Sequence, residues 1–255
     1  MAEEKPPTEQ HELLIVVLGE HQSGKTSVID RLLGLDESSL PRKRTLFFKR
    51  REGQAGGRKV VMVDTPGWWR SYPLMDMAEI MKLKLVLSLP RPPCGPHAFL
   101  LTIVIDESFD EKNRKSVEEH LELFGDSVWE HTIVMFTRGE SLEGKTIEQH
   151  IESEGKALQC LLEKCGNQYC IFDNQARDQS NVIQLLEKVD SVLLRNSGRQ
   201  FELNENIFKE ADEKRTAIKE RSQTRLLRMT EHNKKNCRDQ SLPMTEIRIL
   251  LVGWV

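Results

Sequence analysis

The chain has no apolar run long enough to cross a lipid bilayer. Its clearest apolar stretches, residues 13–18 and 98–105, are much shorter than the about 20 residues that a membrane helix needs. Residues 1–7 read MAEEKPP and are too polar for a secretory signal peptide. The sequence therefore predicts a cytoplasmic protein with no transmembrane segment.

The chain also has little net charge, because 37 Lys and Arg residues stand against 40 Asp and Glu residues to give −3. This balance predicts no strong attraction to nucleic acid or to an anionic membrane. A basic run surrounds Thr45, but it lacks aromatic residues interleaved at stacking spacing, and the neighbouring segments do not extend it. We interpret this run as a solvated loop and not as a nucleic-acid-binding surface.

Cysteine is scarce as well, with five residues in 255. Cys160, Cys165 and Cys170 are spaced five apart, which matches no zinc-site or thioredoxin pattern and places the first two on different faces of a helix. We therefore interpret them as reduced, packed side chains and not as metal ligands.

Residues 19–26 read Gly-Glu-His-Gln-Ser-Gly-Lys-Thr and fit the phosphate-binding P-loop pattern. A segment of strand length at 12–18, apolar without a break from Leu13 onward, precedes them, while residues 27–33 carry apolar side chains at helical spacing. Strand, glycine loop and helix form the context that the motif requires. A bare tight turn is the alternative that this context disfavours.

The motif assigns a role to each part of the loop. We expect the backbone amides of residues 22–26 and the helix N-terminus to hold an anion. Lys25 adds a positive charge near the β and γ phosphates, and the hydroxyl of Thr26 is predicted to bind Mg²⁺.

A second phosphate-related pattern follows the predicted strand at 58–63, where the chain reads Asp64-Thr65-Pro66-Gly67. An aspartate at the carboxyl end of a parallel strand points toward the P-loop and can hold the Mg²⁺ shell, usually through water. Gly67 lets the backbone come close enough for its amide to reach a γ-phosphate. Behind a P-loop, this turn is typical of a switch that senses the third phosphate.

Thr45, in the predicted loop at 40–57, is the best-placed hydroxyl for a second Mg²⁺ contact. It could equally be a solvated loop residue, and both interpretations stay open. The predicted metal ligands are therefore Thr26, Thr45 and Asp64.

The rest of the chain alternates between predicted strands and helices. The predicted strands lie at 97–105, 130–136 and 168–172, and the predicted helices at 111–124, 147–164 and 181–194. Such alternation indicates a three-layer α/β fold of the P-loop NTPase kind, with a mostly parallel sheet covered by helices on both faces. Ligands of such sheets bind at the carboxyl ends of the strands.

Several blocks in this order resemble the immunity-associated GTPases of the AIG or GIMAP type, in the septin-like branch of the P-loop GTPases. Besides the P-loop, the matching blocks begin at Asp64 (DTPGWW), Gly95 (GPHAFLL), His131 (HTIVMFTR), Thr146 (TIEQH) and Glu163 (EKCGN). The resemblance covers residue 12 to about residue 201. It implies GTP or GDP as the ligand, Mg²⁺ as the metal, and nucleotide-dependent homo- or heterodimers with other GTPase domains of the family.

The residues that would read the base depart from the family pattern. Relatives tend to carry Thr-Arg-x-Asp where this chain has Thr137-Arg138-Gly139-Glu140. Glutamate keeps two acceptor oxygens but adds a methylene, so guanine specificity could weaken; alternatively, Glu140 is a surface carboxylate. By resemblance, Asn174 is the second base contact. The complete predicted nucleotide-binding set is Gly19, Gln22, Ser23, Gly24, Lys25, Thr26, Ser27, Thr45, Asp64, Gly67, Arg138, Glu140 and Asn174.

The residues that would support hydrolysis depart further from the family pattern than the base-reading residues do. Trp68 and Trp69 stand where small GTPases commonly carry a water-orienting glutamine, and we expect their indoles to pack on a helix or in a partner. Many relatives have an arginine after the strand that follows the Gly-Pro-His-Ala block, where this chain has Asp106 and Glu107. Acidic groups would repel the developing phosphate charge. We therefore expect slow or partner-dependent hydrolysis and name no catalytic residue, with Arg70 as a candidate substitute.

The composition changes near residue 200. We expect a polar tail at 1–10, the GTPase domain at 11–200, and a charged helical extension at 201–242. That extension could fold back on the domain or form a coiled-coil arm. Residues 243–255 repeat the pattern of a strand followed by glycine, which predicts the first strand of a truncated second GTPase domain; an unrelated apolar tail is the alternative.

Two functions are compatible with these observations. The favoured one is a guanine-nucleotide switch or self-assembling scaffold, in which GTP orders the loops around Thr45 and Gly67 and hydrolysis is weak. The rival is an actively turning-over NTPase with relaxed base specificity.

Overall fold

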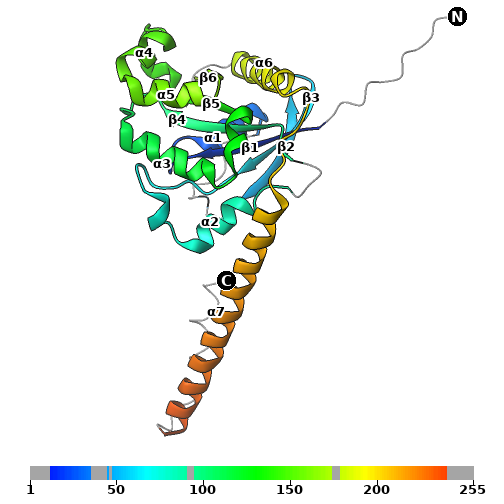
Figure 1. Cartoon of the computed structure of the whole chain (residues 1–255), viewed down its shortest axis with the longest axis vertical. Coiled ribbons are helices and arrows are strands. Elements are labelled where there is room, and N and C mark those ends of the chain that lie inside the picture. The colour runs from blue at the N-terminus through cyan, green and yellow to red at the C-terminus, as the bar shows by residue number, and fades with distance from the viewer. Residues whose placement is uncertain (1–11, 36–44, 46–47, 91–94, 174–178, 240–255) are drawn as a thin grey trace, which may run out of the picture. The chain divides into compact units, whose positions relative to one another are not determined.

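The computed structural model describes residues 12–35, 45, 48–90, 95–173 and 179–239. Within these residues, six strands form one sheet in the order β2-β3-β1-β4-β5-β6 (Figure 1). Only β2 runs antiparallel to its neighbour, and the other adjacent pairs are parallel. The strands are β1 (Leu13–Gly19), β2 (Lys49–Ala55), β3 (Arg58–Asp64), β4 (Ala98–Val104), β5 (Thr132–Thr137) and β6 (Tyr169–Phe172).

Helices cover both faces of this sheet, which confirms the predicted three-layer α/β arrangement. The α-helices are α1 (Lys25–Leu32), α2 (Glu79–Val86), α3 (Glu111–Glu122), α4 (Ile147–Glu154), α5 (Lys156–Lys164), α6 (Ser180–Arg195) and α7 (Glu205–Asp239). Short 3-10 helices are η1 (Leu74–Asp76), η2 (Asp126–His131) and η3 (Gly139–Leu142).

The core follows from the alternation of side chains along each strand. Ile15 and Val17 of β1 point to one face, where they join Val28 of α1 and Val189 of α6 in one buried cluster. On the other face, Phe99 of β4 packs against Phe124, just after α3, with ring centroids 5.5 Å apart. Because both faces are buried, the central strands consist mostly of apolar residues.

The prediction of a solvated loop at 40–57 is wrong for the second half of that range, which forms the edge strand β2. The charged side chains of β2 are mostly exposed, and its backbone pairs with β3 from Lys49 opposite Asp64 to Ala55 opposite Arg58. Gly56 and Gly57, both with positive φ, make the two-residue hairpin turn. Pairing with β3 therefore makes a strand of a sequence whose own composition does not favour one.

Two helix predictions also need correction. The predicted helix at 147–164 is broken into α4 and α5 at Gly155, whose φ of 87° lies in the region that glycine favours. The helix α2, which follows the Asp64 turn, was not predicted. Three apolar residues of α2 are buried, namely Leu83, Leu85 and Val86.

The charged stretch after residue 200 forms the long helix α7. The boundary between two compact units falls within it, between Ala211 and Asp212. In the first unit, Phe201, Leu203 and Phe208 are buried. No described helix is both long and apolar enough to span a membrane. The predicted segments 1–10 and 243–255 lie outside the described residues, and the predicted domain boundaries stay predictions.

The prediction that the cysteines are reduced and packed is confirmed in part. Cys165 and Cys170 are free and buried, as predicted, and burial raises the pKa of each thiol to about 12. Cys160 is also free but exposed, so its expected packing is wrong.

Candidate phosphate and metal site

The P-loop connects β1 to α1 at the carboxyl edge of the sheet. Gln22 and Gly24 have φ values of 65° and 87°, and Gly24 is the residue that immediately precedes α1. Ser27 lies in the first turn of that helix, and Gln22 is exposed at the loop. The left-handed conformations curl the loop tightly around the helix N-terminus, a position that favours a bound anion.

Lys25 points back into the loop and is almost completely buried, with 6% of its surface exposed. Its Nζ donates hydrogen bonds to the carbonyl oxygens of Gly19 at 3.1 Å and Glu20 at 2.5 Å. Burial lowers the pKa of Lys25 to about 8, an effect that attraction to Asp64 and Glu20 partly offsets. A buried cation without a full counter-ion is a binding site for an anion.

Gly67 lies against this lysine. A Cβ atom added at Gly67 would stand 2.6 Å from Lys25 Nζ and 2.8 Å from the backbone nitrogen of His21. Any side chain at position 67 would therefore occupy the space in front of the lysine. The glycine keeps that space open and brings its own backbone to the loop.

The three predicted metal ligands come together, although they lie far apart in the sequence. Thr26 Oγ1 donates to Asp64 Oδ2 at 2.8 Å, and Thr45 Oγ1 donates to the same oxygen at 3.3 Å. The two hydroxyl oxygens are 3.4 Å apart. Two hydroxyls and a carboxylate are oxygen ligands of the kind that Mg²⁺ takes.

The second oxygen of Asp64 supports a cation at this point. Asp64 is fully buried, and its Oδ1 has no hydrogen-bond partner among the described residues. An uncompensated buried carboxylate oxygen is costly unless a donor or a cation satisfies it. The residues present therefore fit a divalent metal.

The ends of β4 and β5 hold the P-loop in place. The hydroxyls of Ser23 and Thr102 lie 2.6 Å apart, and Thr102 Oγ1 donates to Leu18 O at 3.1 Å. Thr137 Oγ1 donates to Ser23 O at 3.1 Å. Neither Thr102 nor Thr137 was predicted to support the P-loop, although a hydroxyl near the carboxyl end of a buried strand is a signal that could have identified them.

The segment after Gly67 is paired with the P-loop. Glu20 and Trp68 form a parallel bridge, and the backbone nitrogen of His21 donates to Trp68 O at 2.5 Å. Trp68 is buried and stacks on His120 of α3, with centroids 4.4 Å apart and planes 14° apart. Trp69 remains 52% exposed, 4.7 Å from the ring of His21. Trp68 thus packs on a helix as expected, and Trp69 lies at the surface.

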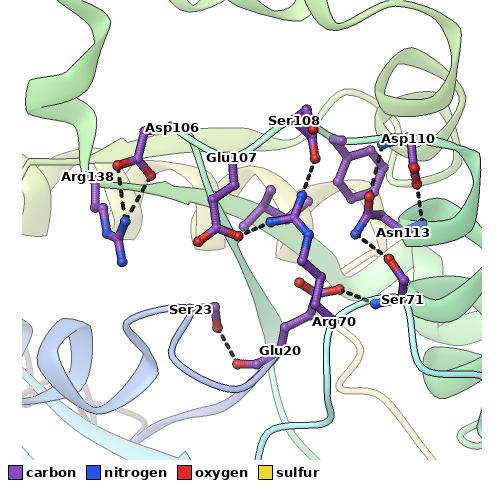
Figure 2. A network of polar contacts seen from close by, with 12 residues as sticks. Glu20, Ser23, Arg70, Ser71, Asp106, Glu107, Ser108, Asp110, Asn113 and Arg138 are labelled. Carbon is purple, nitrogen blue, oxygen red and sulfur yellow. Dashed lines mark hydrogen bonds and ion pairs between the residues drawn. The ribbon is translucent and has the colours of Figure 1, made fainter.

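Both acidic residues after β4 are paired with arginine. Arg138 Nη1 lies 3.0 Å from each carboxylate oxygen of Asp106, and Arg70 pairs with Glu107 while donating to Ser108 O (Figure 2). The repulsion expected from Asp106 and Glu107 is therefore balanced locally by two guanidinium groups.

The predicted base-reading residues are described only in part. Arg138 has a left-handed φ of 60° and begins the turn that carries Glu140 in η3. Its guanidinium faces Asp106, which was not foreseen. Asn174 lies outside the described residues. The structure therefore brings together the phosphate and metal residues, while the base-binding role of Arg138, Glu140 and Asn174 stays a prediction.

Comparison with known proteins agrees with this geometry. Residues 13–222 match the model of the AIG1 family. The chain is 30% identical over 196 residues to GTPase IMAP family member 8 of Homo sapiens, covering 73% of this chain and 28% of that protein. It is 28% identical over 222 residues to Immune-associated nucleotide-binding protein 9 of Arabidopsis thaliana, covering 82% of this chain and 62% of that one. The chain thus spans only part of these relatives' length.

Among solved structures, Toc33 from Arabidopsis thaliana in complex with GDP and Mg²⁺ shares the fold with a TM-score of 0.58. The two sequences are 15% identical, and the match covers 76% of this chain and 88% of that one. A second Toc33 structure, of a dimerization-deficient mutant, matches with a TM-score of 0.56 at 16% identity, over 74% of this chain and 86% of that one.

Proposed function

The chain belongs to the AIG1 family, and from that premise we propose that it binds GTP and GDP with Mg²⁺ as a nucleotide-dependent switch or scaffold. The observation that carries the proposal is the joint placement of a buried P-loop lysine and the cluster of Thr26, Thr45 and Asp64. The relatives described as GTPase or nucleotide-binding proteins support the choice of ligand.

Each part of the site has a role in this proposal. The loop amides and Lys25 bind the phosphates, and Gly67 offers its amide to the third phosphate. Thr26, Thr45 and Asp64 hold the Mg²⁺, which neutralises negative charge on the phosphates when it is bound. Because Gly67 and Thr45 belong to separate segments, a third phosphate would order both around one ligand.

Arg138, Glu140 and Asn174 are proposed to read the guanine. Glu140 replaces the aspartate expected from the family, and this replacement is the observation that favours the rival function, a turning-over NTPase with relaxed base specificity.

Titration with fluorescent GTP, GDP and ATP analogues, each with Mg²⁺ and with a chelator, tests binding and base choice together. The proposal expects GTP and GDP to bind more tightly than ATP, and Mg²⁺ to strengthen GTP binding. Equal affinity for GTP and ATP would support relaxed specificity, and no saturable binding of any nucleotide would refute the proposal.

Hydrolysis is proposed to be slow in the isolated protein. Trp68 and Trp69 cannot orient water as glutamine does, and Arg70 and Arg138 are both paired with carboxylates. We therefore expect turnover at or below about 10⁻⁴ to 10⁻³ per second, the intrinsic range of an unassisted GTPase. Multiple-turnover phosphate release at dilute concentration measures this rate, and a much faster rate would favour the rival function.

The switch or scaffold function requires a partner, proposed to be a second GTPase domain of this family. One of the matching structures is a dimerization-deficient mutant of Toc33, so dimerization is a property of Toc33 and is proposed, not shown, for this chain. Light scattering of this chain with GDP and with a non-hydrolysable GTP analogue tests the proposal. A larger mass with the triphosphate supports nucleotide-dependent pairing, and the same monomeric mass in both states at high concentration contradicts self-pairing.

A further inference from the structure

Arg70 lies three residues after Gly67, and its side chain extends toward the loop that joins β4 to α3. There it pairs with the carboxylate of Glu107 and donates to the carbonyl oxygen of Ser108 (Figure 2). Arg70, Glu107 and Glu20 of the P-loop line the same small cavity. The guanidinium is therefore held beside the phosphate loop by a residue outside that loop.

The backbone next to Arg70 is fixed against the P-loop. The backbone nitrogen of Ser71 donates to Glu20 Oε1 at 3.3 Å, and Asn113 Nδ2 donates to Ser71 Oγ at 3.0 Å. Asn113 is itself held by the capping box at the start of α3. These contacts place the main chain at position 70 independently of where the guanidinium points.

The ion pair itself is accessible to solvent. The side chains of Arg70 and Glu107 are 36% and 42% exposed. Exposed pairs of this kind are weak, because water competes for both charges. A triphosphate carries more negative charge than one carboxylate and accepts arginine in a forked geometry, so it can compete for the same guanidinium.

We propose that Arg70 contacts the phosphates of the nucleotide bound by its own chain. The ion pair with Glu107 keeps the guanidinium of Arg70 away from those phosphates until the pair breaks. The inference rests on the proposed function. On release from Glu107, the guanidinium turns about its side-chain bonds toward the terminal phosphate, while the backbone stays in place. Glu107 thereby restrains hydrolysis in the isolated domain.

The reaction is the transfer of the γ-phosphoryl group to water. A bond forms between the water oxygen and the γ-phosphorus as the bond from that phosphorus to the β–γ bridging oxygen breaks, giving GDP and inorganic phosphate. One proton of the water stays on the attacking oxygen, and the other passes to another oxygen of the released phosphate. Arg70 remains protonated throughout and stabilises the charge on the transferring group and the leaving oxygen.

Single-turnover hydrolysis of bound GTP, with GDP and GTP affinities measured separately, tests the proposal on the full chain. Glu107→Gln removes the restraining charge and is expected to raise the rate about two- to fivefold, the factor that an exposed ion pair supports. Arg70→Ala is expected to lower the rate about tenfold or more, and Arg70→Lys to give an intermediate rate. All three are expected to bind GDP within about twofold of the wild type.

Glu111→Gln is the matched control, because Glu111 pairs with Arg114 on the outside of α3. It is expected to change neither rate nor affinity. The double variant Glu107→Gln with Arg70→Ala is expected to hydrolyse GTP as slowly as Arg70→Ala alone, since the released group is missing.

Several results would overturn the inference. An unchanged rate in Arg70→Ala, no rate increase in Glu107→Gln, or a rate increase that persists in the double variant each contradicts it. Thermal unfolding checks that Arg70→Ala and Arg70→Lys are folded. Loss of nucleotide affinity in the folded variants would show that Arg70 supports nucleotide binding and not hydrolysis. If wild-type protein binds no nucleotide, the proposed function fails and the inference fails with it; normal binding with Arg70-independent hydrolysis removes the inference alone.

Discussion

Thr26 Oγ1 lies 2.8 Å from Asp64 Oδ2, joining the first turn of α1 to the carboxyl end of β3 across 38 positions of sequence. This contact orients one oxygen of a buried carboxylate and leaves the other, Oδ1, without a partner among the described residues. It also aligns the P-loop with the segment that carries Gly67. A phosphate-bound cation would therefore be sensed by both segments at once.

Asp64→Asn tests this relationship. The substitution keeps the size of the side chain but removes its charge, so the gain in GTP affinity on adding Mg²⁺ is expected to fall about tenfold or more. Calorimetric titrations with Mg²⁺ and with a chelator measure the gain. Asp190→Asn, in an exposed pair with Arg58, is the matched control. A full Mg²⁺ effect in Asp64→Asn would remove Asp64 from the metal site.

Lys25→Ala is expected to abolish triphosphate binding, with a loss of affinity on the order of a hundredfold or more, while the protein stays folded. Within the part of the chain that the structure describes, the lysine side chain bonds only to groups of the P-loop itself, and its buried charge costs free energy when no anion is bound. Calorimetry and thermal unfolding provide the two measurements. Lys112→Ala is the control, because Lys112 is an exposed residue of α3. Unchanged affinity in Lys25→Ala would refute the P-loop assignment.

Nucleotide affinity is expected to fall as pH rises above about 8, where burial places the pKa of Lys25 in the free protein. Below that pH the lysine is already charged, so affinity should be flat with respect to its titration. Above it, binding must restore the lost proton, which costs up to about tenfold in affinity per pH unit. GDP titrations between about pH 7 and pH 9 measure the slope, and constant affinity over this range would contradict the shifted pKa.

Glu140→Asp is expected to sharpen the preference for GTP over ATP by about tenfold, because a shorter side chain restores the usual reach to the guanine edge. Competition between the two nucleotides measures the preference. Glu143→Asp in the same exposed turn is the control. If the preference for GTP falls instead, the longer side chain of Glu140 already has the reach that this site needs to bind the guanine edge.

Deletion of all residues after Leu242 is expected to leave nucleotide affinity unchanged and to improve solubility. The removed segment carries an apolar strand pattern, which would expose unpaired backbone groups if it has no sheet to join. The sheet already has β1 in a central position between β3 and β4. Loss of GTP binding or of thermal stability would show that the tail belongs to the first domain.

Much of the fold and the phosphate site could be predicted because the signals are local. An apolar strand, a glycine loop and a helix follow one another within residues 12–33, and Asp64 comes directly after a strand. In a parallel sheet, the carboxyl ends of strands share one edge, so Thr26 and Asp64 could be placed near each other before any contact was seen.

The missed features depend on neighbours that are distant in sequence. The composition of β2 favours a loop, and only hydrogen bonding to β3 makes it a strand. Thr102 and Thr137 support Ser23 from two other strands, and no spacing pattern links the three residues. Glycine at 155 could have been interpreted as a helix end, but its neighbours are helical on both sides.

The sequence by itself determined the P-loop, the positions of the parallel strands along the chain, and the residue types at the metal site, because each rests on short-range pattern and stereochemistry. Only the tertiary structure decided that Asp64 keeps a buried oxygen unpaired, that Trp68 stacks on α3, and that Arg70 is held by Glu107. Burial and ion pairing depend on which segments become neighbours when the sheet assembles, and chain order alone does not specify those distances.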